Sequence, residues 1–69
     1  MNNTKRIKLK KKRMYRELTQ QDIVDYLKSK GVKITQGHYS KIENGSKNPS
    51  LKVAKEIANF FNTTIEKII

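Results

Sequence analysis

The stretch Thr35–Ser50, TQGHYSKIENGSKNPS, decides the fold of this chain. Thr35 is a residue type that caps helices, and Asn44-Gly45 before a Lys-Asn-Pro loop is a typical helix end. The sequence therefore predicts a helix over about 35–44. Its first turn is polar and uncharged, and consists of Gln36, Gly37 and His38. These residue types do not pack a core, so we expect the turn to face solvent or a partner.

A second helix is predicted just before this stretch. Thr19–Asp22 has the capping-box form, in which the threonine hydroxyl and the aspartate carboxylate satisfy each other's backbone N–H groups. An apolar stripe follows at helical spacing: Ile23, Val24 and Leu27. Gly31 comes directly after two lysines, Lys28 and Lys30, as is typical of a helix end.

The remaining segments are also predicted to be helical. Lys5–Glu17 is basic, and Ile7, Met14 and the following Leu18 fall on one side at helical spacing. Pro49 is expected to start a fourth helix, whose inward stripe is Leu51, Ala54, Ile57, Ala58 and Phe61. Thr63–Glu66 again has the capping-box form and predicts a last short helix. The chain is thus predicted to be all-α: a compact five-helix domain over 6–69, with a flexible basic tip at 1–5.

Charge is the strongest compositional signal. The chain has 16 Lys and Arg against 6 Asp and Glu, for a net charge of +10. Half of the basic residues lie in the first 16 positions, which contain no acidic residue: Lys5, Arg6, Lys8, Lys10, Lys11, Lys12, Arg13 and Arg16. Such a balance indicates a polyanionic partner, either nucleic acid or an acidic membrane surface. The lipid alternative is weaker because the basic helix has too narrow an apolar face.

Several function classes are disfavoured. The chain has no cysteine and one histidine, His38, and no acidic cluster is spaced to complete a metal site, so we expect no metal and no cofactor. Ser40 lies on a different helix face from His38, and no acid orients a catalytic triad, so we expect no enzyme. No apolar run approaches the roughly 18 residues of a membrane span. We therefore expect a cytoplasmic protein that has no membrane contact.

Two helices joined by a short connection, the second with a polar first turn, have the form that a helix-turn-helix reader of DNA requires. The second helix enters the major groove, where its N-terminal side chains must reach base edges. A glutamine there can bond N6 and N7 of adenine together. The free N–H groups at both helix starts can hold phosphates. The alternative is a polar helix start that is merely exposed to solvent.

Two segments resemble a known family. LKKKRMYRELTQQDIV (9–24) and ITQGHYSKIENGSKNPSLKVAKEIANFFNTTIEKII (34–69) resemble the lambda-Cro/C1-type, XRE-like helix-turn-helix proteins, which include phage repressors and small bacterial regulators. The segment SKIENGSKNPS is the most specific part, and the resemblance covers about Leu9 to Ile69. It implies a lambda-repressor-like DNA-binding domain, in which the helix over 35–44 is the recognition helix.

The resemblance also implies roles for particular residues. The positions expected to face the bases are Gln36, Gly37, His38 and Lys41. The positions expected to contact phosphates are Gln20, Thr35, Asn44, Ser46, Lys47 and Asn48. Gln20 is also expected to buttress the base-reading glutamine. Arg13 and Glu43 match positions that form a buried ion pair between the first and third helices. We expect this pair to be structural, because a lone buried charge would be costly.

The chain departs from the family in two places. The connection between the second and third helices is longer by more than one helical turn of 3.6 residues. We assign the extra length to an extended second helix, DYLKSKGVK at 25–33, whose three lysines either widen the phosphate contact or are solvated. Gly37 has no side chain that could bond a base. Either the backbone approaches DNA there, or a neighbour such as His38 does the reading.

From these features we expect a sequence-specific regulator that binds double-stranded DNA, a repressor of phage or mobile-element type. It would occupy a palindromic operator as a homodimer, associated with the nucleoid. A C-terminal apolar set either forms the dimer contact or simply caps a thin core: Phe60, Ile65, Ile68 and Ile69. One alternative is an antitoxin-like module with autoregulatory DNA binding, which would use the same apolar patch at 60–69. Another is a non-specific or architectural nucleic-acid-binding protein, which would use the basic N-terminus.

Overall fold

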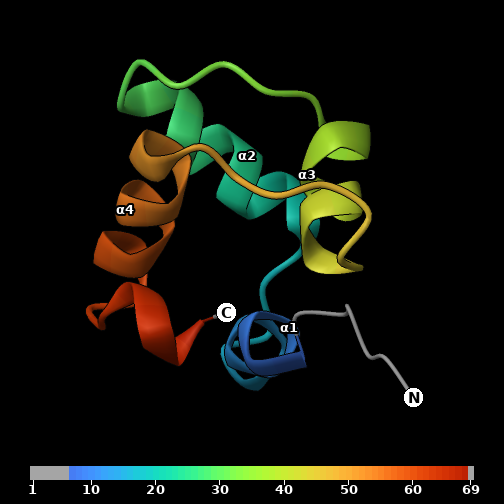
Figure 1. The fold of residues 1–69 in the computed structure, drawn as a ribbon, viewed down its shortest axis with the longest axis vertical. Helices are drawn as coiled ribbons and strands as arrows, with labels where there is room; N and C mark the ends of the chain where they lie inside the picture. Colours follow the sequence, from blue (N-terminus) through green and yellow to red (C-terminus); the bar gives the residue numbers. More distant parts are fainter. Residues whose placement is uncertain (1–6, 69) are drawn as a thin grey trace.

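The computed structural model describes residues 7–68, and the tip at 1–5 and Ile69 lie outside that range. Four α-helices follow one another: α1 (Ile7–Tyr15), α2 (Gln20–Ser29), α3 (Gln36–Glu43) and α4 (Leu51–Phe60). The predicted fifth helix is instead a single 3-10 turn, η1 (Ile65–Lys67). The described part of the chain contains no strand, so the all-α prediction is confirmed. Figure 1 shows α2 and α3 side by side, with α1 below them and α4 beside α2.

One apolar core joins these elements. The α2 stripe is buried as the sequence predicted, and Tyr39 and Ile42 face inward from α3. The core residues of the described chain are Leu9, Ile23, Val24, Leu27, Val32, Tyr39, Ile42, Val53, Ile57, Ala58, Phe61 and Ile68. Partly buried side chains packed against them are Leu18, Tyr26, Ile34, Phe60 and Ile65. Tyr39 is fully buried, which fixes the rotation of α3 about its own axis.

α1 contacts the core through a different side from the one that the sequence predicted. Leu9 is 1% exposed, whereas Ile7 is 43% and Met14 57% exposed. Arg13 follows Leu9 by four residues, so it shares Leu9's face of the helix. The side marked by Ile7 and Met14 therefore does not face the core, whereas Leu18, expected on the same side, packs against it. The inward side is formed by Leu9 and the partly buried Arg13, a pair that apolar spacing alone does not select.

α2 ends at Ser29, earlier than predicted. Gly31 has φ of +82°, the left-handed conformation that glycine adopts without strain. Its N–H donates to Lys28 O (3.0 Å), and the Val32 N–H donates to Leu27 O (2.8 Å), which is a Schellman motif. The predicted extension of this helix over 25–33 is therefore wrong. The extra residues instead form a connection at 30–35 that runs from the end of α2 to the start of α3 (Figure 1).

Three details of the C-terminal half also differ from the predictions. The residue that caps α4 is Ser50, whose hydroxyl accepts from the Val53 N–H at 3.2 Å, so Pro49 lies just outside the helix. Leu51, expected in the inward stripe, is exposed. Thr64 precedes η1 and makes no side-chain cap hydrogen bond. The capping box predicted at 63–66 is therefore absent, and without it only one turn of 3-10 helix forms.

Arg16 joins α1 to the end of α4. Its two terminal nitrogens lie 3.4 and 3.3 Å from the carbonyl oxygens of Phe60 and Phe61, where the last carbonyls of α4 lack helical partners. Its guanidinium also lies 5.2 Å from the centroid of the Phe61 ring. A cation at a helix C-terminus is stabilising, so this arginine holds the two ends of the domain together.

The inward side of α1 can be tested by two truncations. We expect Leu9→Ala to lower the free energy of unfolding by about 2–5 kcal/mol, because it removes fully buried methyl groups. Met14→Ala serves as the control and should change it by no more than about 0.5 kcal/mol, because Met14 is exposed. Urea denaturation followed by circular dichroism measures both. Equal losses in the two variants would contradict this orientation of α1.

Candidate nucleic-acid interface

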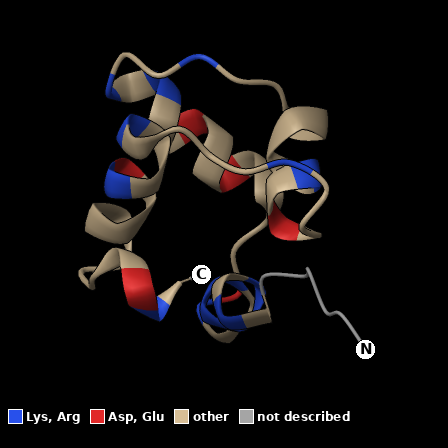
Figure 2. Ribbon diagram, viewed as in Figure 1, with Lys and Arg blue, Asp and Glu red and all other residues tan. Residues whose placement is uncertain are grey.

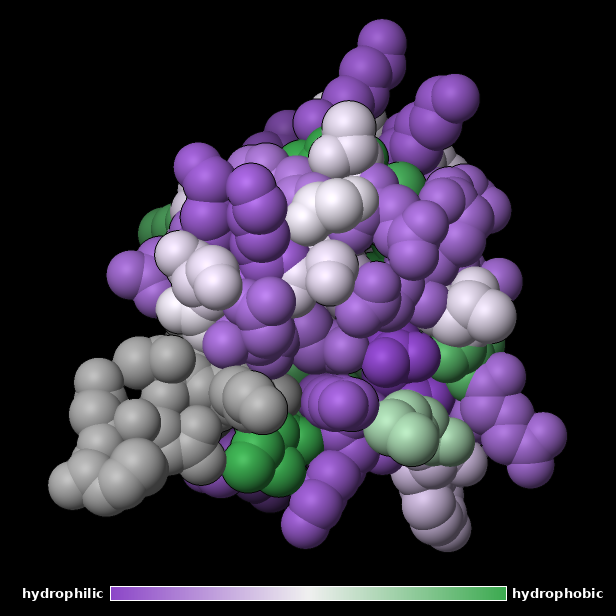
Figure 3. Space-filling model, turned by 90° about the vertical axis from the view of Figure 1, so that its right-hand side faces the viewer, coloured by the Kyte–Doolittle hydropathy of each residue, from purple (hydrophilic) through white to green (hydrophobic). Residues whose placement is uncertain are grey.

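The N-terminal turn of α3 lies on the surface, with its polar residues directed outward. The Thr35 hydroxyl accepts from the His38 N–H at 3.0 Å and so caps the helix. Among the candidate base-reading residues, Gln36, Gly37 and Lys41 are exposed and His38 is partly exposed. Figure 3 views the molecule from the α3 side and shows a mostly hydrophilic face, with small apolar areas near the bottom. This end of α3 is available to a polar partner.

Glycine at position 37 is not required by packing. A Cβ built there would meet only the Thr35 Oγ1 within 4 Å, at 3.9 Å, which is an ordinary contact. Gly37 also sits in regular helix, so its backbone does not need glycine either. Gly37 therefore leaves open space on the outer surface of the turn. It also lowers the stability of the helix, because glycine has a lower helix propensity than alanine.

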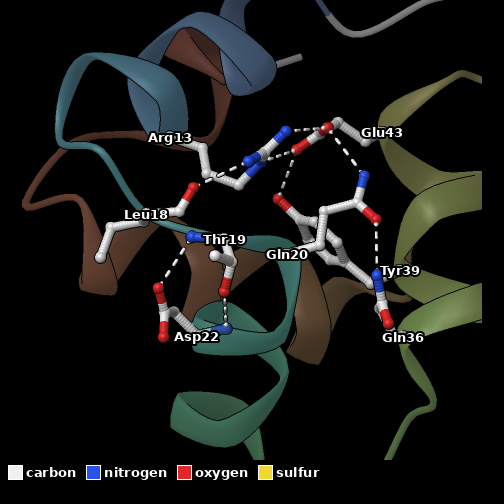
Figure 4. A network of polar contacts seen from close by, with 8 residues as sticks. All are labelled: Arg13, Leu18, Thr19, Gln20, Asp22, Gln36, Tyr39 and Glu43. Atoms are coloured by element: carbon white, nitrogen blue, oxygen red, sulfur yellow. Dashed lines mark hydrogen bonds and ion pairs between the residues drawn. The ribbon is translucent and has the colours of Figure 1, made fainter.

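Behind this turn, the buried carboxylate of Glu43 gathers hydrogen bonds from three helices (Figure 4). Arg13 of α1 donates from Nε to Oε2 at 2.8 Å and from Nη2 to Oε1 at 2.9 Å. Gln20 of α2 donates to Oε1 at 3.1 Å, and the Tyr39 hydroxyl of α3 donates to Oε2 at 3.0 Å. Arg13 also donates from Nη1 to the Leu18 carbonyl at 2.8 Å. The pair that the resemblance assigns to structure is thus the centre of a wider network.

Electrostatics keeps this network charged. Burial alone would raise the pKa of Glu43, but the hydrogen bonds from Arg13, Gln20 and Tyr39 and the charge of Arg13 outweigh burial and lower it. The hydrogen bond with Glu43 raises the pKa of Arg13. Burial, followed by the negative charge of Glu43, raises the pKa of the Tyr39 hydroxyl. At neutral pH the carboxylate is therefore ionised and the phenol keeps its proton.

The network reaches the candidate base-reading turn through Gln20. The Gln20 side chain donates to Glu43 and accepts, on Oε1, from the Gln36 Nε2 at 3.4 Å. Figure 4 shows the four residues in a row, from Arg13 through Glu43 and Gln20 to Gln36. Gln20 uses both ends of its amide, so it orients Gln36 relative to the rigid core.

The loop after α3 is shaped by its own polar groups. The Asn44 Oδ1 accepts from the Ser46 N–H at 2.9 Å, and the Lys47 N–H donates to the Lys41 carbonyl at 3.1 Å. The side chains of Ser46, Lys47 and Asn48 are exposed. The loop therefore presents candidate phosphate-binding residues next to the C-terminal end of α3.

A groove of about 580 Å³ separates α1 from α3. Its α1 side is lined by Ile7, Lys10, Lys11, Arg13 and Met14, and its other side by Gln20, Ser40, Glu43 and Asn44. Two candidate phosphate-binding residues, Gln20 and Asn44, thus share this groove with two lysines that the sequence offered only as part of a basic run. Lys8, Lys10 and Lys11 are exposed and Lys12 is partly exposed, while Lys5 and Arg6 lie outside the described residues.

The C-terminal apolar residues do not form an exposed patch. Phe61 is 4% and Ile68 3% exposed, and Phe60 and Ile65 are partly buried against the core. The surface at 60–69 that the sequence offered for dimerisation or toxin neutralisation is thus largely used inside the domain, as far as residues 60–68 are concerned. The exposed large apolar side chains among the described residues are instead Ile7, Met14, Tyr15 and Leu51.

Residues 7–68 contain neither a cluster of metal-binding side chains nor a helix that could span a membrane. No group of three or more His, Cys, Asp or Glu side chains is placed to hold a metal ion. No helix in this part of the chain has the length and apolar character to cross a membrane.

Comparison with known proteins gives one match. A helix-turn-helix family model, of the Cro/C1 type, matches residues 9–68 and so covers nearly all of the described chain. No curated protein and no solved structure gives a significant match.

The ionised state of Glu43 predicts a pH dependence of stability. The pKa of Glu43 is lower in the folded than in the unfolded protein, where it is about 4.3. Its carboxylate therefore stabilises the fold above that pH, and this stabilisation is lost as the pH falls through the folded-state pKa. At pH 7 we expect Glu43→Gln to lower the free energy of unfolding by about 2–4 kcal/mol. The difference from wild type should shrink as the pH falls below about 4. Urea denaturation between pH 7 and 2 measures it.

The exposed Glu66 provides the matched control, since Glu66→Gln changes the same chemical group outside the core. Its stability should run parallel to that of wild type across the pH range. A loss in Glu43→Gln that stays constant down to pH 2 would show that the carboxylate charge contributes nothing.

Proposed function

Because the chain belongs to the Cro/C1-type helix-turn-helix family of DNA-binding transcription regulators, we propose that it is a sequence-specific repressor of phage or mobile-element type. It acts in the cytoplasm, on nucleoid DNA, by occupying an operator and excluding polymerase. The observation that carries the proposal is the exposed glutamine at position 36, which is hydrogen bonded to Gln20 and through it to a buried ion pair. A side chain oriented in this way is suited to reading a base.

In this proposal the N-terminal turn of α3 enters the major groove. Gln36 bonds N6 and N7 of an adenine, the pairing that a glutamine amide fits best. Lys41, one and a half turns further along α3, reaches a guanine. His38 reads the neighbouring base pair, and the space left by Gly37 lets the helix backbone approach the base edges closely.

Phosphate contacts hold α3 in register. Thr35 and Gln20 contact the backbone near the N-terminal turn, and the loop residues contact it at the far end: Asn44, Ser46, Lys47 and Asn48. Lys10 and Lys11 border the same groove as Gln20 and Asn44, and add sequence-independent, salt-sensitive affinity.

Two copies bind one operator. α3 has only eight residues, so a single copy reads few base pairs. Helix-turn-helix proteins gain specificity by binding two half-sites about one DNA turn apart, which makes the operator palindromic. The contact between copies is polar and small if it uses the described C-terminal segment, because the apolar residues there are mostly buried. We therefore propose a homodimer that assembles on DNA.

Base reading by Gln36 is tested by substitution. We expect Gln36→Ala to weaken binding to the preferred site by about 1–3 kcal/mol and to leave binding to random duplex nearly unchanged. Fluorescence anisotropy with a duplex enriched from a random pool, and with a scrambled duplex, measures both. Gln21→Ala is the matched control, because Gln21 is an exposed glutamine of α2 that bonds only Asp25 among the described contacts.

The enriched sequence tests the rest of the proposal. A two-fold symmetric site, preferred by roughly 10³-fold or more over random duplex, supports operator binding by a homodimer. Steep salt dependence without any preferred sequence would instead assign the protein to the architectural class, with Gln36 reading nothing.

A further inference from the structure

The last turn of α2 and the connection at 30–35 carry lysines that the proposed base-reading and phosphate-binding residues do not include. We propose that Lys28 and Lys33 form a second phosphate-binding site, which contacts the DNA backbone beside the N-terminal end of α3. This inference rests on the proposed function. It extends that function to the end of α2 and to the connection before α3, which the resemblance implies is longer here than is usual in the family. It predicts backbone contacts at both ends of the recognition helix.

The two lysines share one concave surface. A hollow of about 300 Å³ is lined by Lys28 and Lys33 together with Ile34 and Thr35. Both lysine side chains are exposed, and neither has an acidic partner within residues 7–68. Two cations in one unneutralised hollow favour an anionic ligand. Lysine binds phosphate as a point charge and needs no rigid fork of donors.

Lys30, between them, is directed elsewhere. Its Nζ lies 5.6 Å from the centroid of the Tyr26 ring, and Tyr26 packs against Phe60 with ring centroids 4.6 Å apart. Lys30 thus belongs to the side of the domain that faces α4. Lys28 and Lys33 can therefore act together, whereas Lys30 stabilises the aromatic pair of Tyr26 and Phe60.

The backbone beneath the site is anchored at both ends. On one side the Gly31 and Val32 N–H groups close the Schellman motif on α2, and Val32 is buried in the core. On the other side Ile34 packs against the core and Thr35 caps α3. Lys33 therefore sits on a short segment whose two neighbours are both fixed, which reduces the entropy lost when it binds.

The position of the site selects the partner. Thr35 lines the hollow and is followed directly by Gln36, so the hollow adjoins the start of the helix proposed to read bases. Figure 2 shows basic positions at the end of α2 and on the connection, and others at the opposite end of α3. A duplex that receives α3 in its major groove has a phosphate strand on each border of that groove. Phosphates of this duplex are the anions that the site would meet.

The test compares Lys28→Gln/Lys33→Gln with a charge-matched control, Lys55→Gln/Lys67→Gln. Both control lysines are exposed, on α4 and η1. Anisotropy titrations use the enriched duplex and the random duplex over a range of salt concentrations. We expect the Lys28/Lys33 variant to lose roughly tenfold or more in affinity at about 0.1 M salt, equally on both duplexes. Its salt slope should be shallower than that of the control by about 2 for each bound copy, because each lost phosphate contact removes about 0.9.

Replacing single DNA phosphates by uncharged groups tests where the two lysines contact the duplex. Methylphosphonates introduced one at a time along the enriched duplex should weaken wild type at positions beside the half-site, and the Lys28/Lys33 variant should be insensitive at one or more of these positions. The same affinity and slope in the two double variants would overturn this inference and leave operator binding intact. If wild type prefers no sequence, the proposed function is overturned. The salt slopes of the two double variants on random duplex would still decide whether Lys28 and Lys33 contact phosphates.

Discussion

A carboxylate that is removed from water must be satisfied by its neighbours, and the arrangement of this domain follows from how Glu43 meets that requirement. Its donors come from α1, α2 and α3, so the carboxylate fixes the distances among all three helices. An apolar core resists separation of helices but tolerates small rotations between them. Hydrogen bonds of defined length do not. The network therefore sets the direction of α3 more closely than the core alone would, and Gln20 carries that order to the surface.

Much of the fold was predictable from local signals. The caps at Thr19 and Thr35, the left-handed glycine at position 31 and the apolar stripe of α2 each depend on residues within one or two turns, and each is present in the structure. Arg13 and Glu43, which the resemblance pairs, do lie in contact. The base-reading and phosphate-binding roles rest on the resemblance and on exposure, and they remain predictions until DNA is bound.

The parts that were wrong depend on long-range contacts or on competing local signals. α1 has so few apolar residues that their spacing indicated the wrong inward face, and Leu9 and the paired Arg13 form that face instead. The length of α2 was overestimated because the extra residues of the connection were assigned to helix, although Gly31 ends it. The sequence left open whether Phe60 and the C-terminal isoleucines form a contact surface or complete a thin core, and among residues 60–68 they mostly belong to the core.

The basic surface of α1 has a consequence for how long the protein survives. Lys8, Lys10, Lys11 and Lys12 lie within five positions of one helix that contains no acidic residue, so they repel one another while the protein is free. A polyanion that covers this surface removes the repulsion and, by binding only the folded state, lowers the population that unfolds. Proteases that act on unfolded chains would then remove unbound copies faster than bound ones. The rate at which the protein is degraded would then depend on how much of it is bound. Copies in excess of their binding sites would be degraded without a specific degradation signal.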